Sequence, residues 1–323
     1  MTPMLRAIVL RLGSAALTLL IVSSLIFAAL EMLPGGFAQA TLGQAATPEA
    51  VAAFNKELGL DRPALVRYLE WLGAAAQGDL GVSYAGGSGS ARRDIATLIS
   101  DRLYNTFFLA AYAALLAIPL ALALGISAAL WRNSWYDRVV NTSTLAAIAL
   151  PEFFVAYVLI YCLAIKLNLA GALSNVDAST GFFEHLKKAT LPALTLTLVI
   201  LAHIMRMTRA SIISLLDSPY VEMARLKGTR PAKIILRHVL PNAWAPIISI
   251  IVFDLAYLIS GAVVVEVVFV YPGIGQLMVD AVSSRDMPVV QACALIFAVT
   301  YVGLNLLADI MTTMTNPQLR YKA

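Results

Sequence analysis

Few residues in this chain could do chemistry, and they are scattered. None of the 323 residues belongs to a glycine-rich phosphate loop followed by Lys-Ser or Lys-Thr, to an H-E-x-x-H or to a G-x-S-x-G. Histidines and cysteines do not cluster at the spacings of metal ligands or nucleophile–base pairs. They are His185, His203, His238, Cys162 and Cys293. We therefore expect a chain that binds no cofactor or metal and catalyses no covalent reaction.

Two carboxylates, Asp254 and Glu266, stand inside an apolar run at about 245–270. An ionisable side chain in such a run is costly to bury, so it is by default a hypothesis for a functional site. Asp254 could belong to a translocation path. It could equally be a structural carboxylate that hydrogen-bonds to a neighbouring helix or a partner subunit. The residues alone leave both alternatives open.

The most basic stretch, residues 217–243, lies between two long apolar runs. Its pattern predicts two short helices, the first capped by Ser218 and ended by Gly228 at positive φ. The second helix is expected to start near Thr229, to carry one apolar stripe and to end at Pro241. The stripe residues are Ile235, Leu236, Val239 and Leu240. Such a segment could dock on a partner, although a loop whose cations only set topology has a similar composition.

Composition places most of the chain in a membrane. Hydrophobic residues make up 60% of it and charged residues 13%, whereas soluble globular chains carry about 25% charged residues. Several apolar runs reach the roughly 20 residues needed to cross the hydrocarbon core of a bilayer. Topology accounts for the net charge of +4, and no basic patch interleaved with aromatic residues predicts nucleic-acid binding.

The apolar runs predict an all-α integral membrane protein with six transmembrane helices. Their expected positions are about 12–30, 103–131, 146–165, 191–207, 245–270 and 289–311. The first run also resembles a signal peptide, with Ala38-Gln39-Ala40 at a cleavage-like position. It is longer than a usual signal core and long enough to span, so a first transmembrane helix is expected there.

A long polar segment between the first two spans predicts a small external subdomain. Two short helices are expected in it, at about 48–58 and 63–77, with a Gly/Ser-rich tip at 85–90. The chain then divides into four parts. These are a first helix at 1–33, the external subdomain at 34–101, a five-helix core at 102–316 and a tail at 317–323.

Charge placement predicts that both termini are cytoplasmic. Short cytoplasmic loops carry an excess of Lys and Arg, and each segment assigned to that side holds at least two such residues. These cations are Arg6, Arg11, Arg132, Arg138, Arg206, Arg209, Arg225, Lys227, Arg230, Lys233, Arg237, Arg320 and Lys322.

The residue order within 217–243 resembles a known signature. Glu222-Met223-Ala224-x-x-x-Gly228 is followed after nine residues by His238-Val239-Leu240-Pro241. This order is similar to the E-A-A-x-x-x-G-x9-I-x-L-P loop of ABC-importer permeases, which sits in a cleft of the ATP-hydrolysing subunit. Met223 and His238 depart from that pattern. The histidine looks like the R-H-x-L-x-N-A variant of peptide permeases.

The resemblance implies a role for each residue of the loop. It places polar contacts, close approach to the ATPase and the exit angle of the chain on separate residues. Glu222, Arg225 and Lys227 would make the polar contacts. Ala224 and Gly228 would permit the close approach, and Leu240 and Pro241 would fix the exit angle of the chain.

Other motifs match the same family in the same order. The segment from Gly261 to Gly275 resembles G-x-x-x-x-E-x-V-F-x-x-P-G-x-G, in which Pro272, Gly273 and Gly275 form an external turn. Glu266 is expected to anchor that turn rather than to bind substrate. Further matches are Leu58–Pro63 with Gly78–Gly81, Arg285–Gln291 and the tail from Asn316.

The resemblance therefore points to the dipeptide and oligopeptide branch of type I ABC-importer permeases. Such permeases sit in the bacterial inner membrane with a second permease, usually a paralogue. They work with two ATPase subunits that bind ATP and Mg²⁺ and with an external substrate-binding protein. The implied cargo is a peptide or similar small solute.

Two other classes of protein compete with this interpretation. A secondary transporter or channel could use Asp254, but no repeat-related broken helices are evident and the 217–243 pattern would be unexplained. A membrane-embedded enzyme would need a catalytic constellation, and none is present.

Overall fold

The computed structural model describes residues 3–32, 38–39, 46–57, 59–84, 93–177 and 179–315, and helices dominate these ranges. The expected tip at 85–90 and the tail at 317–323 lie outside them. The helices are α1 (Pro3–Glu31), α3 (Pro48–Glu57), α4 (Ala64–Ala76), α5 (Ile95–Leu130), α6 (Trp135–Ala149), α7 (Glu152–Leu159), α8 (Phe182–Leu216), α9 (Pro219–Leu226), α10 (Pro231–Ile234), α11 (Leu240–Phe269), α12 (Ile274–Ser283) and α13 (Met287–Thr315). Two π-helical segments, η2 (Ile160–Lys166) and η3 (Ile235–Val239), continue α7 and α10.

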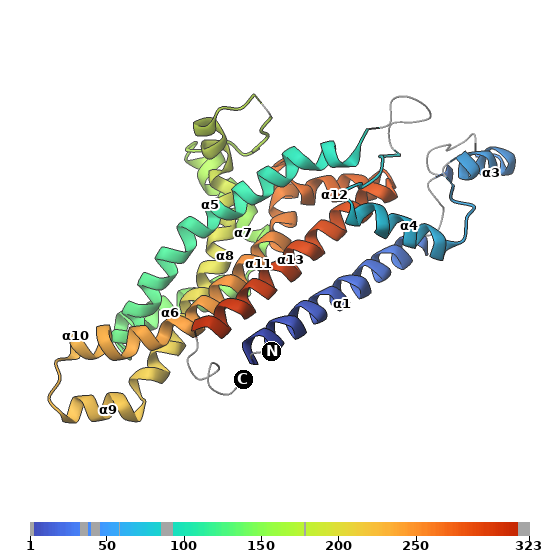
Figure 1. The fold of residues 1–323 in the computed structure, drawn as a ribbon. Coiled ribbons are helices and arrows are strands. Elements are labelled where there is room, and N and C mark those ends of the chain that lie inside the picture. Colours follow the sequence, from blue (N-terminus) through green and yellow to red (C-terminus); the bar gives the residue numbers. More distant parts are fainter. Residues whose placement is uncertain are drawn as a thin grey trace.

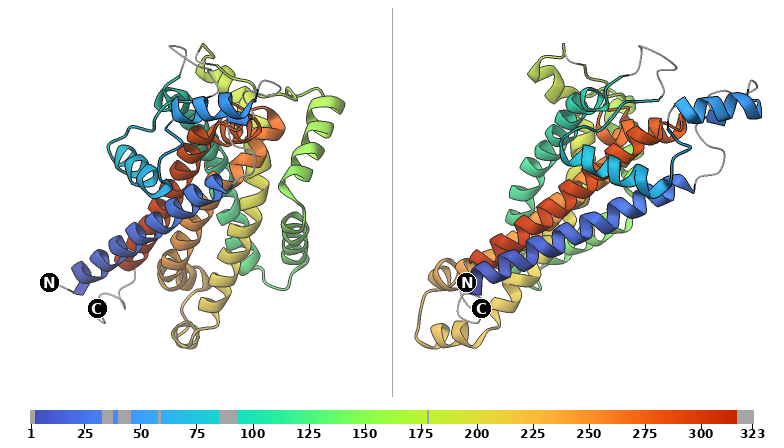
Figure 2. Two further views of the ribbon diagram at one scale, coloured as in Figure 1. Left: turned by 90° about the vertical axis from the view of Figure 1, so that its right-hand side faces the viewer. Right: turned by 45° about the vertical axis from the view of Figure 1, so that its right-hand side comes forward.

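Five helices in the described residues are long and apolar enough to cross a membrane. A sixth span exists only if α6 and the helix 152–166 are counted together, and these two meet at an angle of 106° (Figure 2). The third span expected at 146–165 is thus present only as part of a bent pair, with its break at Leu150 and Pro151. Leu150 takes an extended conformation with ψ of 133°, because the ring of Pro151 disfavours helical geometry in the preceding residue.

The spanning helices are longer than their apolar runs. The span expected at 191–207 is α8, which has 35 residues, and at 1.5 Å per residue it is about 50 Å long. The span expected at 103–131 begins at Ile95, where the Asp94 side chain accepts a hydrogen bond from the N–H group of Ala96. Charged residues outside the hydrocarbon core do not end a helix, so hydropathy alone misses these extensions.

The helices form an elongated bundle with different structures at its two ends (Figure 1). One end holds α9, α10 and the first residues of α1, and the opposite end holds α3, α4 and α12. α1 runs alongside α13, and Arg11 pairs with Asp309 across them at 2.9 Å. The segment expected as an external subdomain thus lies at the end opposite the basic loop.

The most extensive helix contact, between α5 and α8, is built on small side chains. One face of α5 repeats small buried residues every three or four positions. They are Ala110, Ala113, Ala117, Ala121, Gly125 and Ala128. Lipid is as apolar as these side chains, so the contact gains little from the hydrophobic effect and depends on close van der Waals packing. At Gly125 the two helices approach closely, since a methyl group there would lie 2.8 Å from the backbone oxygen of Met205.

Replacing Gly125 with alanine is expected to force α5 and α8 apart. The added methyl group meets a backbone atom that cannot rotate away, so we expect a loss of about 1–3 kcal/mol of stability. The measurement is the thermal unfolding midpoint of the detergent-purified chain. Gly303→Ala is the matched control, because Gly303 is also helical and has nothing within 4 Å of its added methyl group. Equal midpoints for the two variants would contradict the close contact.

Candidate docking loop and embedded polar sites

The segment 217–243 forms a two-helix projection at one end of the bundle (Figure 1). Helix α9 is attached by Val221 and Ala224, whose exposed fractions are 0% and 9%. These residues pack in one cluster with Ile212 of α8, Ala129 of α5 and Ile247 of α11. The projection is therefore fixed to three spanning helices through its apolar side.

Helix α9 ends in a Schellman motif. Gly228 has φ of +73°, its N–H group donates to the oxygen of Arg225, and the N–H group of Thr229 donates to the oxygen of Ala224. A residue with a Cβ atom is strained at this φ, which explains the glycine. The expectation that Gly228 ends the first helix at positive φ is confirmed.

The start of α9 differs from the expectation. Ser218 stands at the cap position, but its side chain accepts no hydrogen bond from the first turn. The Ser218 hydroxyl instead donates back to the oxygen of Leu215 at the end of α8. The predicted side-chain cap is wrong, and Ser218 joins α8 to α9. Glu222 does lie in the first turn, where the helix dipole favours a negative charge.

The outer face of α9 is unusually apolar for an exposed helix. Tyr220, Met223 and Leu226 have exposed fractions of 42%, 57% and 77%, and Glu222, Arg225 and Lys227 surround them. Large exposed apolar side chains with a charged rim are typical of protein interaction surfaces. A methyl group added at Gly228 would have no atom of the described residues within 4 Å apart from its chain neighbours, so that corner is open to a partner.

Pro241 does not end the second helix, contrary to expectation. It lies in the first turn of α11, and the helical path continues from Pro231 to Phe269. The wider π-helical turn η3 precedes it and relieves the clash of the ring with the preceding turn. The oxygen of His238 accepts from the side-chain amide of Asn242 at 2.7 Å.

The same π-helical turn changes which residues face the bundle. Val239 is fully buried, whereas Leu236 has an exposed fraction of 65%. The predicted single apolar stripe is therefore wrong at Leu236, because Leu236 lies within the π-helical turn, whose i→i+5 hydrogen bonds change which side chains share a face. Leu236 adds to the exposed apolar side chains of the projection.

Asp254 is paired within this chain. It has an exposed fraction of 3%, and its Oδ1 and Oδ2 atoms lie 2.7 and 3.0 Å from Nδ1 of His203 on α8. The structural alternative for Asp254 thus has a specific partner on a neighbouring helix. The His203 side chain is 44% exposed, so the pair also borders an open space.

That space is a cavity of about 660 Å³ between the α6–α7 bend, α8 and α11. Glu152 enters it from the start of α7 and accepts a hydrogen bond from Tyr257 at 2.7 Å. Apolar walls dominate the remainder. They are formed by Ile148, Pro151, Phe153, Val199, Phe253 and Val264. The cavity therefore combines a largely apolar lining with two carboxylates and one histidine.

Glu266 lies at the opposite end of the bundle and is fully buried. Its Oε2 atom accepts from the N–H groups of Gly275 and Gln276 at 2.8 and 3.2 Å, and its Oε1 atom accepts from Thr106 at 2.6 Å. The carboxylate thus binds the positive end of α12 and joins α11 to α5. A methyl group at Gly273 would lie 2.1 Å from the Glu266 carboxyl group, so the turn needs glycine there.

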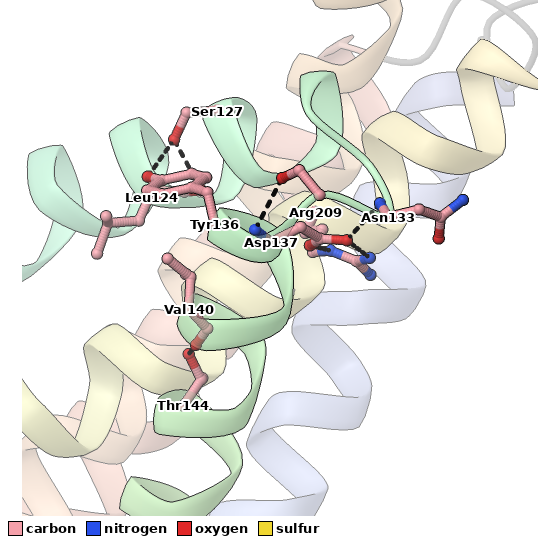
Figure 3. A network of polar contacts seen from close by, with 9 residues as sticks. Leu124, Ser127, Asn133, Tyr136, Asp137, Val140, Thr144 and Arg209 are labelled. Carbon is pink, nitrogen blue, oxygen red and sulfur yellow. Dashed lines mark hydrogen bonds and ion pairs between the residues drawn. The ribbon is translucent and has the colours of Figure 1, made fainter.

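An ion pair that the sequence patterns did not suggest fixes α6 to α8. Arg209 donates to both oxygens of Asp137, from Nε at 2.6 Å and from Nη2 at 2.8 Å (Figure 3). The N–H group of Asn133 also donates to Asp137, and Ser134 caps α6 through the Asp137 N–H group. Arg132 in the same turn pairs with Asp217 at the start of the projection, at 2.9 Å.

The structure separates the candidate residues into three places. Residues 222–228 and 238–241 form one unit at the α9 end, Asp254 lies along the bundle, and Glu266 with Pro272, Gly273 and Gly275 lies at the α12 end (Figure 1). His203, Arg209 and Asp137 were not singled out as partners. The opposite charges of Arg209 and Asp137, and the acid–base match of His203 and Asp254, were the available signal. Each of these pairs, however, joins helices that are distant in sequence.

A helical bundle with five or six apolar spans in its described residues defines a multi-pass membrane protein. The family model "Binding-protein-dependent transport system inner membrane component" matches residues 121–321, and its N-terminal companion matches residues 4–110. The chain belongs to this family of ABC-transporter permeases. It is thus the permease subunit of a binding-protein-dependent importer.

Curated relatives match along their entire length. The chain is 36% identical over 319 residues to the "Glutathione transport system permease protein GsiC" of Escherichia coli O6:H1, covering 99% of this chain and 100% of the relative. It is 35% identical to the protein of that name in Escherichia coli K12 and 34% identical to that in Salmonella choleraesuis, with the same coverage.

Proposed function

We propose that residues 217–243 dock in a cleft of a separate ATPase subunit on the cytoplasmic side. With a second permease, usually a paralogue, the chain would form the path for a peptide or similar small solute that an external binding protein delivers. ATP and Mg²⁺ would bind to the two ATPase subunits and not to this chain. The residues proposed to carry the coupling are Glu222, Met223, Ala224, Arg225, Lys227, Gly228, His238, Leu240 and Pro241.

The observation that carries the proposal is the continuity of the projection with the spanning helices. α8 leads through a two-residue turn into α9, and α10 continues into α11 without a break from Pro231 to Phe269. A displacement of the projection must therefore move α8 and α11 together. These two helices carry His203 and Asp254, which border the cavity.

Thermodynamic linkage would couple binding of the ATPase to the conformation of the permease. A docked ATPase can shift the permease between inward-facing and outward-facing states only if its binding free energy differs between them. The rigid attachment through Val221 and Ala224 supplies that dependence, because α9 cannot move without α5, α8 and α11. The Asp137–Arg209 pair extends the linkage to α6, which forms one wall of the cavity.

Orientation supports the same proposal. The end of the bundle that holds α9 also holds Arg132, Arg225, Lys227, Arg230, Lys233 and Arg237. Cations in short loops favour the cytoplasmic side, and the start of α1 lies at this end too. The opposite end, with α3, α4 and α12, would then face the external binding protein.

The test is a pull-down from detergent of the complete importer, with wild type and Gly228→Asp. The substitution adds a side chain at φ of +73° and a negative charge next to the proposed contact. We expect the variant to fold, to lose ATPase binding, and to lose solute-stimulated ATP hydrolysis by roughly tenfold or more, since about 1.4 kcal/mol at an interface is a factor of ten.

A matched control exists at the other end of the molecule. Gly78 ends α4 in the same hydrogen-bonding motif, with φ of +85° and nothing within 4 Å of an added methyl group. Gly78→Asp therefore introduces the same strain and charge away from the proposed ATPase. If Gly228→Asp retains ATPase binding, or if both variants lose it equally, the assignment of the loop fails.

A further inference from the structure

The cavity between the α6–α7 bend, α8 and α11 has the chemistry of a binding site. It is mostly apolar, and its few polar side chains converge from three helices, which is the usual composition of small-molecule sites. Its walls are half exposed: His203 is 44% exposed, as is Tyr257. In the isolated chain the polar groups are therefore open to the surroundings of the bundle.

The cavity is lined by more acidic than basic side chains. Asp254 and Glu152 are carboxylates, whereas His203 is the one basic side chain among the cavity-lining residues. His203 is engaged with Asp254. Arg206 follows His203 on α8 but is exposed and does not line the cavity. A cation entering the cavity would thus be attracted, and an anion repelled.

Glu152 has unused hydrogen-bonding capacity. Its Oε1 atom accepts from Tyr257, and no hydrogen bond to its Oε2 atom is found among the described residues. Gly261 keeps α11 close to it, since a methyl group there would lie 3.3 Å from Oε1 and 3.5 Å from Oε2. A carboxylate oxygen that faces an apolar cavity gains from a charged donor.

We propose that this cavity binds the ammonium group of the transported solute, with the free oxygen of Glu152 as the acceptor and the apolar walls around the organic part. A primary ammonium group has three donors and no acceptor, which fits a site that offers carboxylate oxygens. Tyr257 orients Glu152, and the His203–Asp254 pair closes one side. This inference rests on the proposed function and extends it to a solute with a free amino group, such as a peptide.

The first test measures the charge preference of the cavity. In a Cys162→Ser and Cys293→Ala background, Ser260→Cys places a thiol in the cavity lining. The complete importer in detergent is treated with a cationic trimethylammonium-ethyl or an anionic sulfonatoethyl methanethiosulfonate. Both rates are divided by those for free mercaptoethanol. We expect the cationic reagent to be favoured roughly tenfold, and Glu152→Gln to remove most of this preference.

Glu184→Gln is the matched control. Glu184 is an exposed carboxylate that pairs with Lys188 at the far end of α8 and does not line the cavity. It removes the same charge, so the preference at residue 260 should stay. Tyr257→Phe keeps the Glu152 carboxylate and should also retain the preference. Equal rates for both reagents, or a preference that Glu152→Gln leaves unchanged, would overturn the proposal.

The second test asks whether an ammonium group is bound. Trialanine amide and N-acetyl-trialanine amide differ only in that group, and each is added before alkylation of the cysteine at 260 by a neutral maleimide. We expect trialanine amide to slow the reaction at least about threefold at saturation and the acetylated peptide to have no effect. Equal protection by both would show an apolar pocket and overturn the ammonium site. This comparison uses the Ser260→Cys protein alone and needs no further substitution in the cavity.

The two proposals can fail separately. Docking of the ATPase is judged from the pull-down and the ATPase rate, whereas the ammonium site is judged from thiol reactivity in the cavity. If Gly228→Asp keeps its ATPase but the charge preference and peptide protection are present, only the docking assignment is wrong. If the ATPase result stands and the thiol at 260 shows neither effect, only the ammonium site is wrong.

Discussion

Replacing Glu266 with alanine is expected to unfold the α12 end of the bundle at a markedly lower temperature. The substitution leaves the N–H groups of Gly275 and Gln276 and the hydroxyl of Thr106 without their acceptor. Each unsatisfied buried donor costs about 1–3 kcal/mol, so a total loss of roughly 3–9 kcal/mol is expected. Glu266→Gln keeps one acceptor oxygen for the two N–H groups and should lose less, because it gives up only the hydrogen bond from Thr106 and the charge–dipole attraction.

The chain offers its own reporter for this experiment. Cys293 is fully buried and packs in one cluster with Ile274 and Ala281 of α12, so a thiol-reactive fluorophore detects opening at that place. Cys162 is exposed and is replaced by serine. The control is Glu184→Ala, which removes an exposed pair worth less than about 1 kcal/mol. If Glu266→Ala unfolds at the same temperature as Glu184→Ala, the carboxylate does not support α12.

The spanning helices could be predicted from the sequence because lipid leaves the backbone no other solution. An apolar run must satisfy its N–H and C=O groups internally, so each long run becomes a helix. The run at about 245–270 appears in α11 for this reason. Helix ends were less predictable. α8 extends beyond its apolar run at both ends, since outside the hydrocarbon core nothing in the composition opposes the helix.

Local helix signals predicted part of the 217–243 segment. Gly228 was expected at positive φ and has it. The π-helical turn was not expected, because proline inside an apolar pattern ordinarily indicates a stop. Here the preceding turn widens instead, and Pro241 is accommodated in α11.

Contacts between distant helices could not be derived from local patterns. His203 and Asp254 are separated by 51 residues, and neither position shows a periodicity that singles out the other. The α5–α8 contact is different in this respect. The small residues from Ala110 to Ala128 recur at three- and four-residue spacing, and that repeat is a recognised sign of a close helix contact in a membrane.

Replacing Arg209 with alanine is expected to be among the most damaging changes at the α9 end. Asp137 has an exposed fraction of 3% and would keep only its bond from Asn133. Removing one partner of a buried pair costs about 3–5 kcal/mol. Because the Arg209 side chain is 22% exposed, water can reach the carboxylate and we expect roughly 2–4 kcal/mol. The measurement is the thermal unfolding midpoint, with ATPase stimulation as a second readout.

The double variant separates a lost contact from a buried charge. Asp137→Ala with Arg209→Ala leaves no unpaired carboxylate, so it should be more stable than Arg209→Ala alone, and the cycle of four proteins gives the pairing energy directly. Arg132→Ala is the matched control in the same turn. Its pair with Asp217 is 46% and 59% exposed, so it should cost less than about 1 kcal/mol. If Arg209→Ala is no worse than Arg132→Ala, the pair does not hold α6 to α8. Movement of the proposed docking loop would then reach the α6 side of the cavity by another route.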